Sequence, residues 1–78
     1  MNQEPETKIL ENYEPTLEEA QRVVGGYVEM VYLNGGDQLL VNEEGVIKNL
    51  PQNPSATAIA GKPIVGNAIV LKGHARWK

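Results

Sequence analysis

Three arrangements of residues in this 78-residue sequence could do chemistry, and the first is VNEEG at residues 41–45. A calcium loop needs oxygen ligands at alternating positions over about 12 residues, whereas the chain beyond Gly45 continues with mostly apolar and basic residues. Paired-carboxylate hydrolysis needs two groups that flank a substrate, and the adjacent Glu43 and Glu44 would point apart. Asn42 and Gly45 are common turn residues. The run therefore predicts a turn and no metal site.

A hydrolase triad is the second arrangement that the residue types allow. Ser55 and His74 are the only serine and the only histidine, and Asp37 could complete the set. His74, however, lies beside Arg76 and Lys78 in the C-terminal tail, where a histidine is typically solvated. Cysteine is absent, which excludes a cysteine nucleophile and a zinc site with cysteine ligands. The sequence predicts that the protein is not an enzyme and has no cofactor.

The C-terminal segment LKGHARWK is the third arrangement, because it combines basic side chains with the only tryptophan. Cations that contact phosphates and a ring that stacks on a base are the elements of single-strand nucleic-acid binding. The net charge of −3 argues against that role, since such domains are usually basic. Three interpretations of Arg76 and Trp77 stay open: packing or a dimer contact, contact with another protein, and nucleic-acid binding.

The segment LPQNPSATAIAG predicts a short helix and a further binding hypothesis. Asn53 is a good N-cap, Pro54 suits the first helical position, and Gly61 ends the helix. The free amides of the first turn could hold an anion together with Ser55. No glycine-rich approach leads into this helix, so capping alone explains these residues better.

The helix that precedes this region has clear start and stop signals. Thr16 and Glu19 have the spacing of a capping box, in which each side chain bonds the backbone amide of the other residue. Gly25 can take the left-handed conformation that ends a helix. The pattern predicts a helix at residues 17–24.

Strands are predicted where the apolar spacing changes. Residues 27–33 and 38–41 form a hairpin around a glycine-rich turn, and a short strand at 46–47 follows the VNEEG turn. A last strand is predicted at residues 63–65 and 67–71, with Gly66 at a bend or bulge. Its residues 68–71 are apolar without alternation, which indicates a central strand covered on both faces. Residues 8–10 could add a short first strand.

These elements predict one small α+β domain in the order α-β-β-β-α-β, with a short extra N-terminal strand. The sheet is expected to be mostly antiparallel, with both helices on one face. Residues 15–72 would form the domain, residues 73–78 a basic tail, and residues 1–14 an acidic, flexible arm. The chain shows neither a signal peptide nor an apolar run that could span a membrane, which favours a cytoplasmic location and no membrane partner.

The order of several short motifs resembles a known family. The matching residues run from Leu17 to Leu71, and they are Gln21, Val24-Gly25-Gly26, Glu29, Asn42-Glu43, Gly45, Asn53, Ala56 and Ile64-Val65-Gly66. In this order they are similar to the family catalogued as domain of unknown function 3846, which is met in bacteriophages, plasmids and bacterial genomes. The resemblance implies a shared fold and a phage or mobile-element setting, and it implies no activity.

The leading hypothesis is a small, non-catalytic, phage-like accessory protein that binds and modulates a host or phage protein in the host cytoplasm. An exposed apolar patch near Tyr27, Tyr32 or Trp77, with Arg76 beside it, would carry this contact. One alternative is nucleic-acid binding through the tail. Another is a homo-oligomer, such as a homodimer, that holds a small anionic ligand at Asn53 and Ser55.

Overall fold

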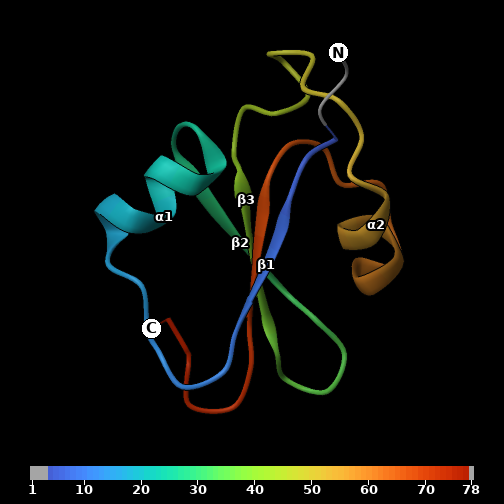
Figure 1. The fold of residues 1–78 in the computed structure, drawn as a ribbon. Coiled ribbons are helices and arrows are strands. Elements are labelled where there is room, and N and C mark those ends of the chain that lie inside the picture. Colours follow the sequence, from blue (N-terminus) through green and yellow to red (C-terminus); the bar gives the residue numbers. More distant parts are fainter. Residues whose placement is uncertain (1–3, 78) are drawn as a thin grey trace.

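Four strands and two helices follow one another in the computed structural model, which describes residues 4–77 (Figure 1). They are Thr7–Leu10 (β1), Leu17–Val24 (α1), Val28–Tyr32 (β2), Gln38–Asn42 (β3), Pro54–Ala60 (α2) and Ala68–Leu71 (β4). The predicted α+β class and the extra first strand are confirmed. One element differs, because Val46 and Ile47 lie in consecutive turns and not in a strand.

The sheet is mixed, with the strand order β1-β4-β3-β2. The two pairs β2–β3 and β3–β4 are antiparallel, whereas β1 runs parallel to β4. The expectation of a mostly antiparallel sheet is corrected by this parallel pairing, which depends on a strand that the sequence only suggested. The central place of the last strand is confirmed, since β4 lies between β1 and β3 and all four of its residues are buried.

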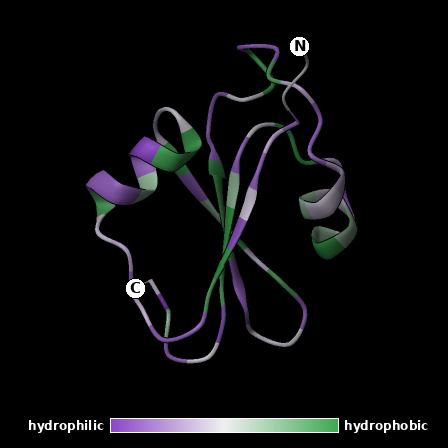
Figure 2. Ribbon diagram, in the orientation of Figure 1, coloured by the Kyte–Doolittle hydropathy of each residue, from purple (hydrophilic) through white to green (hydrophobic). Residues whose placement is uncertain are grey.

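The two helices lie on opposite faces of the sheet, which corrects the prediction that both cover one face (Figure 1). Ala20 of α1 packs in a cluster with Leu40 and Ile69, while Ala56 of α2 packs with Leu39 and Val70 on the other side. Successive side chains of a strand point to opposite faces, so β3 and β4 present apolar residues on both. Each face therefore needs its own cover, and hydrophobic segments lie along the centre of the sheet in Figure 2.

The helix boundaries agree with the capping signals. The Glu19 amide donates to Thr16 Oγ1 at 3.1 Å, and the Thr16 amide donates to Glu19 Oε1 at 3.0 Å. Gly25 ends α1 with φ of 84° and Gly61 ends α2 with φ of 73°, both in the left-handed region that glycine tolerates.

Residues 4–14 of the predicted N-terminal arm and residues 73–77 of the predicted C-terminal tail belong to the folded domain, which corrects the boundaries at residues 14 and 73; residues 1–3 and 78 lie outside the described residues. Thr7–Leu10 is hydrogen-bonded to β4, and Ala75 is fully buried in the cluster beneath α1. The segment that follows β4, up to residue 77, turns back toward the segment that precedes α1 (Figure 1). Neither helix within residues 4–77 is long and apolar enough to cross a membrane.

Candidate functional site

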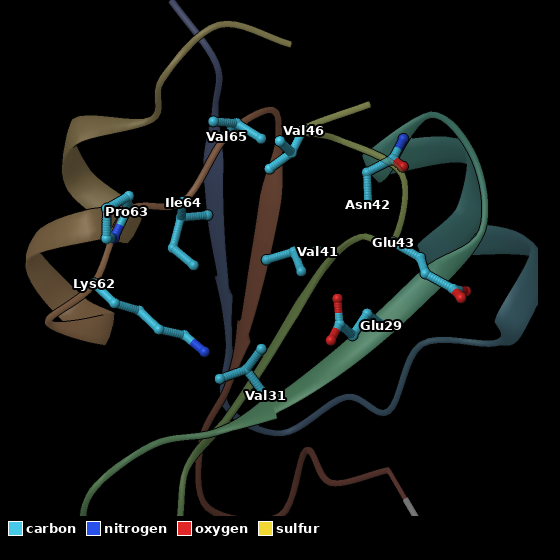
Figure 3. A pocket seen from close by; sticks show the side chains of 10 residues that line it. All are labelled: Glu29, Val31, Val41, Asn42, Glu43, Val46, Lys62, Pro63, Ile64 and Val65. Atoms are coloured by element: carbon cyan, nitrogen blue, oxygen red, sulfur yellow. The ribbon is translucent and has the colours of Figure 1, made fainter. Parts of the chain in front are cut away.

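A hollow of about 140 Å³ opens on the α2 face of the sheet, beside the ends of β2 and β3 (Figure 3). Its walls come from β2, β3, the turn that follows β3, and the segment that links α2 to β4. The lining residues are Glu29, Val31, Val41, Asn42, Glu43, Val46, Lys62, Pro63, Ile64 and Val65. Five of them, Glu29, Asn42, Glu43, Ile64 and Val65, are among the residues that carry the family resemblance.

The hollow combines an apolar wall with charged groups at its rim. Val31, Val41 and Ile64 supply aliphatic surface, while Glu29 and Lys62 approach from different sides (Figure 3). Within residues 4–77, neither of these two charged side chains has an oppositely charged partner at ion-pair distance. The space fits an aliphatic side chain of a bound molecule, and its rim can receive charges of either sign.

The turn that follows β3 forms one wall of the hollow, and we call residues 43–49 the turn loop. Asn42 fixes its start, because Asn42 Oδ1 accepts from the Glu44 amide at 2.8 Å and Asn42 Nδ2 donates to the Val24 carbonyl at 3.1 Å. The predicted VNEEG turn is confirmed. Within residues 4–77, no group of three potential metal ligands is present.

Backbone hydrogen bonds continue through the turn loop to its end. The Lys48 amide donates to the Glu44 carbonyl at 2.9 Å, and the Leu50 amide donates to the Gly45 carbonyl at 3.0 Å. The Lys48 ammonium also pairs with the Glu44 carboxylate at 3.5 Å. The turn loop is thus an ordered structure, although it contains neither a helix nor a strand.

Among residues 4–77, the turn loop presents the most exposed large apolar side chains. Val46 is 81% exposed and Ile47 is 84% exposed, and Val46 also lines the hollow. The sequence interpretation missed this surface because it placed both residues in a strand. The sequence did contain a signal for a turn, because Lys48 and Asn49 follow directly and asparagine is typical of turns. In the structure Asn49 has a positive φ of 59°, which asparagine tolerates.

Tyr27 and Tyr32, which were predicted to contact a partner, are exposed at opposite ends of β2. Tyr27 is 65% exposed and Tyr32 is 68% exposed. The Tyr27 carbonyl accepts from the Glu43 amide at 2.8 Å, so Tyr27 lies next to the turn loop. The structure therefore joins Tyr27 to the turn loop and leaves Tyr32 at the far end of the strand.

Arg76 and Trp77, the other predicted contact residues, bind to the fold itself. Trp77 is half-buried against the cluster beneath α1, and its Nε1 donates to the Pro15 carbonyl at 2.8 Å. Arg76 Nη1 donates to the Gly36 carbonyl at 2.6 Å. Of the interpretations left open for this segment, packing on the fold describes what Trp77 does in the structure.

The groups proposed for anion binding are also engaged within the fold. Asn53 is fully buried, and its Oδ1 accepts from the Ala56 amide and the Thr7 and Ser55 hydroxyls. Its Nδ2 donates to the carbonyls of Glu6 and Gly66. Ser55 Oγ lies 2.8 Å from Thr7 Oγ1. These contacts tie α2 to β1 and to the entry of β4, which gives Asn53 and Ser55 a structural role.

The three residues considered above as a hydrolase triad, Ser55, His74 and Asp37, lie in different parts of the fold. Ser55 contacts Thr7, which pairs with the first residue of β4. Asp37 pairs with Lys72 at 3.5 Å, just beyond the last residue of β4, and His74 is exposed in the segment that follows. The length of β4 separates the serine from the acid, so these side chains form no hydrolase site.

A second hollow of about 100 Å³ lies between β1 and α1, with Tyr13 and Glu19 among its lining residues. The Tyr13 hydroxyl donates to Glu19 Oε2. The pKa of Glu19 is lowered, mainly by the hydrogen bond from the Thr16 amide and further by that from Tyr13. The pKa of Tyr13 is raised, mainly because its proton is held by Glu19. This pair supports the capping box of α1.

Comparison with known proteins assigns the chain to a family. Residues 1–76 match the family model described as Domain of unknown function (DUF3846), which extends the resemblance beyond the segment 17–71. No curated protein and no solved structure was found to match the chain. Because the family model covers nearly the whole sequence, the chain belongs to the family Domain of unknown function (DUF3846).

Proposed function

We propose that this protein is a small, non-catalytic accessory protein that binds and modulates another protein, encoded by a host cell or a phage. The contact surface is the turn-loop surface, formed by Tyr27, Glu43, Val46 and Ile47. The observation that carries the proposal is the presence of two adjacent, almost fully exposed aliphatic side chains on an ordered loop.

The energetics of the turn loop favour a protein contact. Burial of an aliphatic side chain of this size stabilises a complex by about 1.5–3 kcal/mol, so Val46 and Ile47 are candidate anchors. The backbone hydrogen bonds and the Lys48–Glu44 ion pair already order the turn loop. The turn loop would therefore lose less conformational entropy on binding a partner than a flexible loop would lose.

The hollow extends the same surface. Val46 belongs both to the exposed turn loop and to the wall of the hollow, so a partner that covers Val46 can insert a side chain beside it. Glu43 is exposed at the rim and favours a partner with a basic residue next to the inserted group.

The geometry supports the two other hypotheses less well. Nucleic-acid binding needs a ring that is free to stack and cations that are free to meet phosphates, whereas Trp77 and Arg76 are hydrogen-bonded to the fold. Capture of an anion at α2 needs free donors, whereas Asn53 and Ser55 are hydrogen-bonded to neighbouring residues.

A pull-down with the tagged full chain tests the proposal. The bait is incubated with lysates of host and infected cells, with and without nuclease, and recovered proteins are identified by mass spectrometry. The test variant carries Val46→Ser and Ile47→Ser. The matched control carries Ile9→Ser and Ile59→Ser, which replace two exposed isoleucines away from the turn loop.

A stoichiometric partner that resists nuclease, stays with the control and is lost from the turn-loop variant would support the proposal. Recovery that disappears with nuclease would instead favour nucleic acid. A partner retained equally by both variants would overturn the assignment of the turn loop as the contact surface.

A further inference from the structure

The outer edge of β2 carries a row of backbone groups with no partner strand. In the strand order β1-β4-β3-β2, β2 has a neighbour on one side only. The hydrogen bonds from Glu43 N–H to the Tyr27 carbonyl and from Leu33 N–H to the Asp37 carbonyl show that odd-numbered residues of this segment face β3. In an antiparallel strand, the backbone N–H and C=O groups of successive residues point alternately to the two sides of the strand. The amides and carbonyls of Val28, Met30 and Tyr32 therefore point outward, away from β3.

This edge lacks the features that usually prevent strand pairing. β2 contains no proline and no lysine, and its only charge is Glu29. Val28, Met30 and Val31 are half-buried, with part of each apolar side chain left in contact with water. An apolar edge of this kind is normally covered by another strand.

We infer that the β2 edge pairs antiparallel with the β2 edge of a second copy of this chain, around a two-fold axis at Met30. This register places Met30 opposite Met30 and Val28 opposite Tyr32 of the other copy. All outward amides and carbonyls of β2 then find partners, because each such pair exchanges two hydrogen bonds. A register centred on Glu29 is disfavoured, since it would place two carboxylates directly opposite each other.

The charges around the hollow fit the register centred on Met30. It places Glu29 of the second copy directly opposite Val31. Lys62 extends toward Val31 across the hollow in Figure 3 and has no ion-pair partner in its own chain within residues 4–77. Each copy thus offers a free cation where the other brings a free carboxylate, and the two-fold axis repeats this contact. The second copy thereby adds a carboxylate to the hollow.

The size of the chain gives this pairing a thermodynamic role. A domain of this size buries only about 60% of the surface that its unfolded chain exposes, a smaller share than larger domains bury, so an added interface contributes appreciably to its stability. The inference goes beyond the proposed function and does not depend on it. Its interface is the β2 edge, whereas Val46 and Ile47 stay available on the turn loop.

Sedimentation velocity of the full chain, from micromolar to millimolar concentration, measures the association. We expect a dimer of twice the 8.5 kDa chain mass. The variants Glu29→Lys and Lys62→Glu should each weaken dimerisation about tenfold, because each places like charges together, and the combined variant should restore it. Glu43→Lys is the matched control, since Glu43 lines the same hollow but does not face Val31 of the other copy in this register.

Amide hydrogen exchange supplies a second readout that needs no variant. In the dimer, the amides of Val28, Met30 and Tyr32 should exchange more slowly as concentration rises. A chain that stays monomeric at millimolar concentration would overturn the inference. So would fast exchange of these three amides in the dimer, or a combined variant as weak as the single ones.

Discussion

The side-chain amide of Gln38 holds the backbone of Trp77 through two hydrogen bonds. Gln38 Nε2 donates to the Trp77 carbonyl at 2.7 Å, and the Trp77 amide donates to Gln38 Oε1 at 2.6 Å. Gln38 is the first residue of β3 and is 1% exposed. Its amide thus pairs with the C-terminal segment in the way that a neighbouring strand would, and it fixes Trp77 beneath α1.

Replacement of Gln38 by alanine should destabilise the protein by about 1–3 kcal/mol, because two backbone groups of Trp77 lose their partners. The tryptophan should also become more exposed. Urea unfolding, monitored by the red shift of tryptophan fluorescence, measures both effects. Gln52→Ala is the control, since the Gln52 side chain is exposed, and it should leave both quantities unchanged. Equal stability of the two variants would contradict the role of Gln38.

Asn53→Ala should cost about 2–4 kcal/mol, since it removes the N-cap of α2 and leaves buried carbonyls unpaired. Ser55→Ala should cost much less, because Ser55 is exposed and its hydroxyl can be replaced by water. Thermal unfolding of both variants, in buffers with and without phosphate, gives the comparison. A wild-type melting temperature that rises with phosphate, and a Ser55→Ala variant that loses this rise, would revive the anion hypothesis.

Gly45→Ala should destabilise the turn loop by about 1–3 kcal/mol through overpacking. A Cβ at this position would lie 2.7 Å from Val65 Cγ2 and 3.3 Å from the Asn42 carbonyl oxygen. Val65→Ala should relieve the first of these contacts, so the double variant should be more stable than the sum of the single effects predicts. Additive effects in urea unfolding would show that Val65 does not determine the need for glycine.

Glu19 should make stability depend on acid pH. Its pKa in the folded protein lies below the ordinary value of 4.5, so its contribution is present above that pH and is lost as the pH falls through the lowered pKa. Glu19→Gln keeps a side chain that can cap the helix but removes the charge. The melting temperature of the wild type should therefore exceed that of this variant at neutral pH and approach it in acid.

Glu18→Gln is the matched control for this pH dependence, because Glu18 lies in the same turn of α1 but is exposed and takes no part in the capping box. At neutral pH, the difference in melting temperature between wild type and Glu18→Gln should be smaller than that between wild type and Glu19→Gln. A pH profile of Glu19→Gln parallel to that of the wild type would contradict the contribution of the carboxylate.

Local elements of the fold could be predicted because the interactions that form them join residues close in sequence. Thr16 and Glu19 cap α1 across three positions, and the Asn42 side chain shapes its own turn two residues on. The uninterrupted apolar run of β4 likewise indicated that both of its faces are covered.

The candidate site could not be predicted, because it depends on pairings between distant residues. Only the pairing of β1 with β4 makes the sheet mixed, and only the packing of α1 and α2 on opposite faces leaves the hollow open beside Lys62. Likewise, the exposure of Ile47 and the capture of Trp77 by Gln38 follow from the path of the chain in space. Short-range backbone and capping interactions are determined by residues that are close in sequence. Surfaces and hollows, in contrast, depend on contacts between distant residues that form only when the whole domain folds.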